Sequence, residues 1–181
     1  MTVPSDEREL VRRAQQRDRG AFAEIYERYH STIYTHIYYR VGDPSTAEDL
    51  TSEVFVRVVG SIDGFVYRDR PLLTWLYTIA RNLIIDHRRR AGRATMLPLD
   101  ERLENGSEDV ERAAELAVSR RRLAVALDEL TDDQRHVIIL RFIEGRSLEE
   151  VAEIVGKSVG AVKALQHRAL DGLRRVLSPQ S

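Results

Sequence analysis

The stretch Ser147-Leu-Glu-Glu-Val-Ala-Glu-Ile-Val-Gly-Lys-Ser-Val-Gly-Ala-Val-Lys-Ala-Leu165 predicts a helix, a tight turn and a second helix. Ala152 is a small residue where two helices must approach closely, and Gly156 follows where a left-handed turn is needed. Ser158 can cap the second helix. Because small residue, turn glycine, cap and apolar spacing agree, the pattern favours a helix-turn-helix whose second helix contacts the major groove of DNA.

The second predicted helix has an apolar inner face and a polar outer face. The inner face of the pair consists of Val151, Val155, Val159, Val162 and Leu165. The candidates for contacts with phosphates and base edges are the cap and the outward side chains, namely Ser158, Lys163, Gln166, His167 and Arg168. The alternative interpretation is an ordinary helical hairpin with a solvated basic face.

The bulk composition indicates a soluble, helix-rich protein. Of the 181 residues, 43% are hydrophobic, 31% are charged and none is cysteine. The lack of cysteine excludes disulfides and thiolate metal sites. The N-terminal residues form no apolar signal core, and no apolar run approaches the roughly 20 residues that span a bilayer. We therefore expect a cytoplasmic protein without direct membrane insertion.

The net charge of -1 conceals three segments of strong local charge. Residues 81–93 hold five Arg and one Asp, and residues 157–175 hold five bases and one acid. Between them, residues 95–111 hold six acids and one Arg. Nucleic-acid affinity depends on such local basic patches more than on the charge of the whole chain. A solvated helix face is the alternative for each run taken alone.

Helix signals lie on both sides of an acidic segment. Four pairs have the spacing of capping boxes: Asp6 with Glu9, Ser45 with Glu48, Thr131 with Gln134, and Ser147 with Glu150. Residues 92–108 lack an apolar period and contain Gly, Pro and Asn-Gly. We predict an all-α fold of two small helical domains, 1–93 and 112–178, joined by a flexible acidic linker at 94–111. The C-terminal domain is the helix-turn-helix, and we expect no further domain after Leu177.

Three N-terminal motifs resemble conserved region two of bacterial sigma factors. They are Ala21-Phe-Ala-Glu-Ile-Tyr-Glu-Arg-Tyr29, Ala47-Glu-Asp-Leu-Thr-Ser-Glu-Val-Phe-Val-Arg57 and Thr74-Trp-Leu-Tyr-Thr-Ile-Ala-Arg-Asn-Leu83. Residues 127–175 resemble region four of the same family. Because only a short tether separates the two regions, the chain resembles the small extracytoplasmic-function (ECF) group.

The resemblance implies two sets of site residues in the N-terminal domain. Those that would bind a coiled coil of core RNA polymerase are Asp49, Glu53, Phe55 and Arg57. Those that would bind the minus-ten promoter element from a helix over 71–91 are Trp75, Thr78, Arg81, Asn82, Arg88 and Arg89. Asn82 matches the family position that contacts a flipped base. A solvated acidic face is the alternative for the first set, and a core position is the alternative for Trp75.

In the C-terminal domain the resemblance assigns the outward set of the helix-turn-helix to the minus-thirty-five element. Lys163-Ala164-Leu165 stands where some members carry Arg-Ser-Arg, so the promoter bases do not follow from the family. The implied function is a sigma factor that binds core RNA polymerase, directs it to specific promoters and promotes DNA melting. Its implied partners are core polymerase, promoter DNA and an anti-sigma factor.

Two other functional classes fit the sequence less well. A polymerase-independent helix-turn-helix regulator has no reason to carry residues 47–57 and 74–90. An enzyme is disfavoured because the five His residues lack metal-ligand spacing and no phosphate-binding glycine loop or nucleophile elbow occurs. We expect no cofactor, no metal and no small-molecule substrate.

Overall fold

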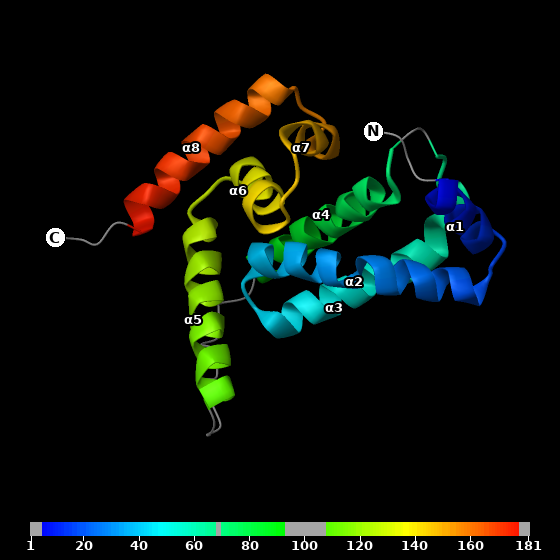
Figure 1. Cartoon of the computed structure of the whole chain (residues 1–181), viewed down its shortest axis with the longest axis horizontal. Helices are drawn as coiled ribbons and strands as arrows, with labels where there is room; N and C mark the ends of the chain where they lie inside the picture. Colours follow the sequence, from blue (N-terminus) through cyan, green and yellow to red (C-terminus); the bar gives the residue numbers. More distant parts are fainter. Residues whose placement is uncertain (1–4, 68–69, 93–107, 178–181) are drawn as a thin grey trace.

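The computed structural model describes residues 5–67, 70–92 and 108–177, and all its regular elements there are helical (Figure 1). The elements are α1 (Ser5–Gln15), α2 (Arg19–Val41), α3 (Pro44–Ser61), η1 (Ile62–Gly64), α4 (Leu72–Ala91), α5 (Glu108–Asp128), α6 (Asp132–Ile138), η2 (Ile139–Ile143), α7 (Leu148–Val155) and α8 (Val159–Leu177). The prediction of an all-α fold with two helical domains is confirmed. Most of the predicted linker at 94–111 lies outside the described residues, but its last four residues already belong to α5.

Two of the four predicted capping boxes are confirmed. Thr131 and Gln134 cap the N-terminus of α6, and Ser147 and Glu150 cap the N-terminus of α7. Each pair supplies hydrogen-bond partners to two backbone N–H groups that the first turn leaves unpaired.

The box predicted at Ser45 is wrong. Asp43 caps α3 instead, since its carboxylate accepts a hydrogen bond from the N–H of Thr46 at 2.7 Å. Pro44 then occupies the first helical position, where its fixed φ suits the helix and its missing N–H costs nothing. Ser45 therefore lies inside α3.

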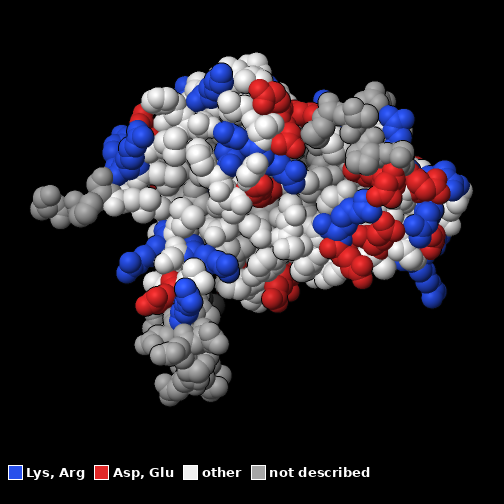
Figure 2. Space-filling model, in the orientation of Figure 1, with Lys and Arg blue, Asp and Glu red and all other residues white. Residues whose placement is uncertain are grey.

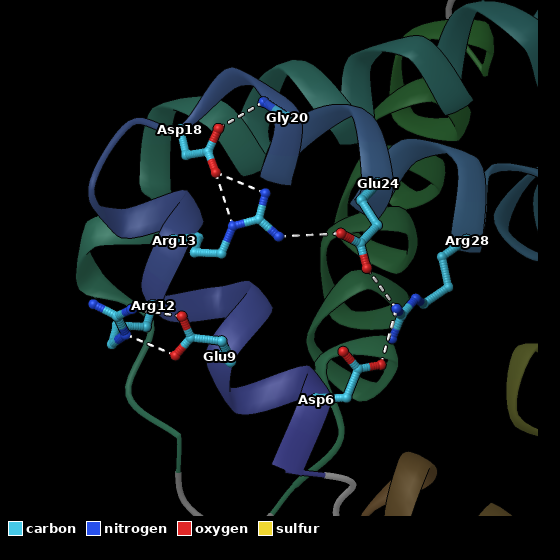
Figure 3. A network of polar contacts seen from close by, with 8 residues as sticks. All are labelled: Asp6, Glu9, Arg12, Arg13, Asp18, Gly20, Glu24 and Arg28. Atoms are coloured by element: carbon cyan, nitrogen blue, oxygen red, sulfur yellow. Dashed lines mark hydrogen bonds and ion pairs between the residues drawn. The ribbon is translucent and has the colours of Figure 1, made fainter.

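The box predicted at Asp6 is also wrong, because Asp6 and Glu9 both lie inside α1 and form ion pairs (Figure 3). Arg28 of α2 bridges Asp6 and Glu24 at 3.1 and 2.6 Å. Arg13 bridges Asp18 and Glu24 at 2.7 and 3.3 Å. These partly exposed pairs each contribute little stability. Two of them, Arg28–Asp6 and Arg13–Glu24, join α1 to α2.

A backbone N–H group at the start of α4 donates a hydrogen bond to a side chain from α1. Pro71 precedes α4 and offers no capping side chain. The buried carboxylate of Glu7 accepts a hydrogen bond from the backbone N–H of Leu72 and another, at 3.0 Å, from the hydroxyl of Tyr67. A carboxylate at a helix N-terminus also complements the helix dipole. This contact fixes where the polar face of α4 begins.

The helix-turn-helix forms as the sequence predicts. Gly156 ends α7 in the left-handed conformation with φ of 66°. The Ser158 hydroxyl accepts a hydrogen bond from the N–H of Ala161 at 3.2 Å at the start of α8. Val151 and Val162 are fully buried between the two helices.

The two domains pack against each other, an arrangement on which the sequence made no prediction. Val137 and Leu140 of the C-terminal domain belong to the same apolar cluster as the core residues of α2 and α4. Arg135 of α6 is buried and donates to the carbonyl oxygens of Leu127 at 2.7 Å and Arg40 at 3.2 Å. Ion pairs from Arg81 and Arg88 of α4 reach the first turn of α6, and α7 lies near the N-terminal end of α4 (Figure 1).

Replacing Gly156 by Ala tests the turn between α7 and α8. An added Cβ meets no atom within 4 Å, so the cost arises from the positive φ alone. We expect Gly156→Ala to lower the free energy of unfolding by about 1–2 kcal/mol. Gly60→Ala is the matched control, because Gly60 also has open space but lies in α3 without a positive φ. Chemical denaturation should show Gly60→Ala neutral or stabilised by about 0.5–1 kcal/mol. Equal effects of the two substitutions would contradict the turn assignment.

Candidate nucleic-acid interface and docking surface

A cavity of about 620 Å³ opens beside the first half of α4. Its walls come from the segment before α4 and from the outer face of the helix: Gly64, Phe65, Val66, Arg70, Pro71, Thr74, Trp75 and Thr78. The Trp75 ring lies 4.9 Å from the Phe65 ring, and Trp75 is half-buried. Trp75 therefore packs on the core with one side and forms a wall of the cavity with the other. An aromatic wall, threonine hydroxyls and one arginine suit a flat, polar-edged ligand such as a nucleobase.

The six side chains predicted for the minus-ten element do not form one group. Trp75 and Thr78 line the cavity, whereas Arg81, Asn82, Arg88 and Arg89 follow on later turns of α4. Asn82 is exposed and is not among the lining residues. The structure adds residues from the preceding segment that the sequence analysis missed, above all Phe65 and Arg70. The sequence signal that could have identified them is the presence of an aromatic residue and an arginine in the loop between Gly64 and Pro71, because loops often carry binding residues.

The cations on the later turns of α4 are paired with acids at the start of α6. A guanidinium N–H of Arg88 donates to Asp132, and Arg81 lies 3.9 Å from Asp133. Asp133 also lies 3.1 Å from the ammonium of Lys157, just before α8. Figure 2 shows basic and acidic side chains side by side where α6 and α7 meet α4. The basic face predicted from the sequence is therefore partly neutralised within the chain.

The outward face of α8 is smaller than predicted. Lys163, His167 and Arg168 are exposed. Gln166 is half-buried, and its side-chain oxygen accepts a hydrogen bond from Arg141 at 3.2 Å. The hydroxyl of Ser158 is occupied as the helix cap. Nδ1 of His167 lies 3.4 Å from a carboxylate oxygen of Asp171. Lys163 and Arg168 are therefore the exposed cations of this face, and such groups suit phosphates and the acceptor edges of guanine.

An apolar groove of about 400 Å³ runs between α2 and α3 on the N-terminal domain. Phe55 forms part of its floor at 9% exposure, in edge contact with Tyr26 at 4.9 Å. Val56 and Val59 stand at its rim and are 70% and 44% exposed. Exposed apolar side chains gathered in a groove commonly mark a binding surface for another protein.

The four residues predicted for polymerase contact take different places around this groove. Phe55 lies in it, as stated above. Asp49 is exposed on α3, and Glu53 and Arg57 form an i,i+4 ion pair at 2.9 Å. The rim residues Val56 and Val59 were not predicted, because an isolated valine in a helix carries no sequence signal of exposure.

A buried polar cluster lies between the two domains. Glu144, which follows η2, accepts a hydrogen bond from the Tyr77 hydroxyl, and its other oxygen lies 3.0 Å from Nδ1 of His36. The ring of His136 lies 5.0 Å from that of His36. The side chains of His36 and Glu144 are 0% and 4% exposed. The sequence analysis did not group these residues because they lie far apart along the chain.

Burial moves the pKa values of this cluster in opposite directions. It raises the pKa of Glu144 to about 7, although the Tyr77 hydroxyl and Arg146 oppose the shift. It lowers the pKa of His36 and of His136 well below 6.5, and nearby cations lower both further. Near neutral pH the two imidazoles are therefore uncharged.

The described residues hold no group of three or more His, Cys, Asp or Glu side chains placed to bind a metal ion. None of the described helices has the length and apolar character needed to cross a membrane.

Comparisons with known proteins give one consistent family. Residues 25–94 match sigma-70 region 2, and residues 126–175 match sigma-70 region 4. The chain is 42% identical to the ECF RNA polymerase sigma factor BldN of Streptomyces coelicolor over 173 residues. The matched segment covers 93% of this chain but only 65% of BldN. It is 38% identical over 161 residues to the ECF RNA polymerase sigma factor SigX of Bacillus subtilis, covering 85% of this chain and 82% of SigX. The solved structure of CnrH in complex with the cytosolic domain of CnrY is similar at a TM-score of 0.73 and 27% identity, over 97% of this chain and 99% of that one.

Replacing Glu144 by Gln tests the buried cluster through pH. The pKa of Glu144 is raised from 4.5 to about 7 in the folded chain. Its stabilising contribution is thus fully present below pH 4.5 and is lost as pH rises through about 7. We expect wild type to lose up to about 3 kcal/mol of unfolding free energy relative to Glu144→Gln over this range.

Chemical denaturation of both proteins at several pH values measures this difference. His36 and His136 are present in both proteins, so their opposite pH dependence largely cancels. A difference that stays constant from pH 4.5 to 7 would show that Glu144 is not buried as described.

Proposed function

The chain belongs to the sigma-70 family, in its ECF group, and on this basis we propose that it is a transcription initiation factor that binds core RNA polymerase, directs it to specific promoters and promotes DNA melting. One observation carries the proposal beyond the family match. The groove between α2 and α3, the cavity beside Trp75 and the outer face of α8 are three separate surfaces, each suited to a different part of that task.

We assign polymerase docking to the groove between α2 and α3. Its apolar floor at Phe55 and its exposed rim at Val56 offer area to bury, while Asp49, Glu53 and Arg57 supply charges around it. An apolar centre with a charged rim is the usual anatomy of a protein interface. A partner helix with apolar side chains and basic neighbours, as in a coiled coil of polymerase, is the occupant that this chemistry fits.

We assign the minus-ten element to the cavity and to the outer turns of α4. Melting requires that a base leave the stack and find a pocket that replaces its stacking. Trp75 and Phe65 offer aromatic surface. Thr78 is exposed at the cavity, and its hydroxyl donates to the carbonyl oxygen of Thr74 at 3.1 Å. Arg81, Arg88 and Arg89 would hold phosphates of the displaced strand, and the exposed amide of Asn82 would contact a base edge.

We assign the minus-thirty-five element to α8, through Lys163, His167 and Arg168, with Gln166 held back by Arg141. The division into 1–93 and 112–178 gives two weak DNA-binding modules. Polymerase holds such modules at a fixed separation, so that the second contact benefits from a high effective concentration. Neither module needs strong affinity alone, which agrees with the net charge of -1.

The same premise bears on partners and location. CnrH is solved in complex with the cytosolic domain of CnrY, and we propose that this chain also binds a second protein, an anti-sigma factor, which holds it inactive. We place its action in the cytoplasm, beside polymerase, and assign it no catalytic reaction of its own. A polymerase-independent regulator would not explain the groove between α2 and α3.

Run-off transcription tests the function as a whole. Core polymerase and a library of genomic fragments are incubated with and without the chain, and the transcripts are sequenced. We expect transcripts that depend on the chain and share two upstream elements. Active core polymerase with no dependent transcript would overturn the proposal.

A charge placed in the groove tests the docking surface. Val56→Asp adds a carboxylate at a position that is 70% exposed, so folding should not change. Burying that charge against polymerase should weaken core binding by at least about tenfold. Val66→Asp is the matched control, since Val66 is 64% exposed but lines the cavity beside Trp75. Titration of labelled core polymerase should show wild-type affinity for Val66→Asp; equal losses for both variants would contradict the assignment.

A further inference from the structure

The segment between α3 and α4 forms one wall of the cavity that we assign to a flipped base. Phe65 and Val66 of this segment line the cavity, and neither lies in a helix. Backbone groups outside regular secondary structure must find their hydrogen-bond partners elsewhere. Several of the partners along this segment are side chains of α1 and of the turn that follows it, and α1 lies beside η1 at the start of the segment (Figure 1).

The amide of Gln15, the last residue of α1, binds the segment at two points. Its nitrogen donates to the carbonyl oxygen of Ile62 at 3.1 Å and to the carbonyl oxygen of Phe65 at 2.9 Å. An amide nitrogen carries two hydrogens, so one side chain satisfies both carbonyls. The backbone N–H of Phe65 in turn donates to the carbonyl oxygen of Ile62 at 3.0 Å. The backbone of Phe65 is therefore fixed on both sides of its Cα atom.

Arg17 attaches the start of the segment two residues later in the chain. Its guanidinium donates to the carbonyl oxygen of Val59 at 2.7 Å, near the end of α3, and pairs with the carboxylate of Asp63. Arg17 has a φ of 62°, a left-handed conformation that residues other than glycine seldom adopt. The exposed ion pair alone contributes little, but the bond to the Val59 carbonyl joins this turn to α3.

Glu7 attaches the other end of the segment. Its buried carboxylate accepts hydrogen bonds from the hydroxyl of Tyr67 and from the backbone N–H at the start of α4. The Phe65 ring lies 5.8 Å from the Tyr67 ring and 4.9 Å from the Trp75 ring, so the aromatic wall lies between the two attachments. We call the three attaching side chains the α1 brace: Glu7, Gln15 and Arg17.

The α1 brace does not reach the cavity itself. None of its three residues is among those that line the cavity, so the brace can affect a bound base only through the segment. Gln15 binds nearest to the aromatic wall, because one of its acceptors is the carbonyl of Phe65. Gln15 is also half-buried, so water competes less for its hydrogen bonds than for those of an exposed side chain.

We propose that Gln15 is a positioning residue for the minus-ten element: by fixing the backbone of Phe65 it keeps the Phe65 ring against Trp75, and it thereby sets how tightly the cavity binds an unstacked base without touching DNA. This role rests on the proposed function. A wall of fixed rings binds a base more tightly than a mobile one, because less conformational freedom is lost on binding. A helix that carries none of the predicted DNA contacts then takes part in promoter recognition.

The fluorescence of Trp75 gives the first test, in the free chain. Trp75 is the only tryptophan of the sequence, so its emission reports on this wall alone. Gln15→Met keeps a side chain of similar length and removes both donated hydrogen bonds. We expect acrylamide to quench Trp75 more strongly in Gln15→Met than in wild type, because a mobile Phe65 ring exposes the indole. Gln16→Met is the matched control at the neighbouring exposed glutamine and should leave the quenching unchanged. Equal quenching in all three proteins would overturn the proposal.

The binding of a base is tested in the complex of core polymerase with the full chain. The probe is a chain-dependent promoter fragment from the run-off experiment, mismatched over the minus-ten region so that its strands are already unpaired. Abasic sites replace the bases of the displaced strand one at a time, and the dissociation constant is measured for each probe. With wild type we expect one abasic site to weaken binding by about tenfold, as expected for the loss of one base stacked on an aromatic side chain. With Gln15→Met the same site should cost less than about threefold, because the stacking is already impaired.

The ratio between intact and abasic probes separates positioning from a loss of folded protein. A variant that is only less stable binds every probe more weakly and keeps the wild-type ratio, and that result would overturn the proposal. A second comparison uses Phe65→Ala. Because Gln15 acts through Phe65, Gln15→Met should cause little further loss of binding in a chain that already carries Phe65→Ala. Fully additive losses from the two substitutions would also overturn the proposal.

Failure of this role and failure of the proposed function give different results. The absence of any chain-dependent transcript would overturn the proposed function and the role of Gln15 with it, even if Gln15→Met changes the quenching of Trp75. Chain-dependent transcripts together with an unchanged abasic ratio in Gln15→Met would overturn the role of Gln15 alone.

Discussion

The arrangement of the whole molecule depends on the carboxylate of Glu144, which contacts Tyr77 of α4 and His36 of α2 in a buried space between the domains. This contact sets the register at which α6 meets α4. Apolar contacts such as those of Val137 and Leu140 with the N-terminal domain are compatible with several arrangements of the two domains. The buried hydrogen bonds of Glu144 can form in only one of these arrangements. Once that register is set, the acids of α6 face the arginines of α4, and the groove between α2 and α3 is left exposed.

Charge in the basic segments is partly neutralised by ion pairs within the chain. Asp132 and Asp133 at the start of α6 pair with Arg88 and Arg81 of α4, and Asp133 also pairs with Lys157 just before α8. A factor that acts only together with polymerase gains from weak intrinsic DNA affinity, since strong local basicity would bind DNA without regard to sequence. Specificity then arises when polymerase holds both domains on one promoter.

Local features were predictable from the sequence, whereas contacts between distant residues were not. The helix-turn-helix was predicted because Gly156, Ser158 and the valine spacing act within a few residues of one another. The cap of α3 was predicted at Ser45 because Ser45 and Glu48 have the spacing of a capping box. The observed cap, Asp43, has Thr46 three residues later and therefore lacks that pattern. Glu144 meets His36 across more than a hundred residues, and no local pattern indicates such a contact. For the same reason the pairing of Arg88 with Asp132 was missed: Arg88 lies in a segment that the sequence marks as basic, but Asp132 lies outside all three charged segments.

The account assigns the register between the two domains to Glu144, and one measurement addresses that assignment directly. The natural chain has no cysteine, so Gln16→Cys/Arg175→Cys accepts one spin label on each domain at exposed positions, and the distance between the labels is recorded with Glu144 present and after Glu144→Ala. The account predicts one narrow distance distribution with Glu144 and a broader distribution after Glu144→Ala. The same narrow distribution in both proteins would contradict it.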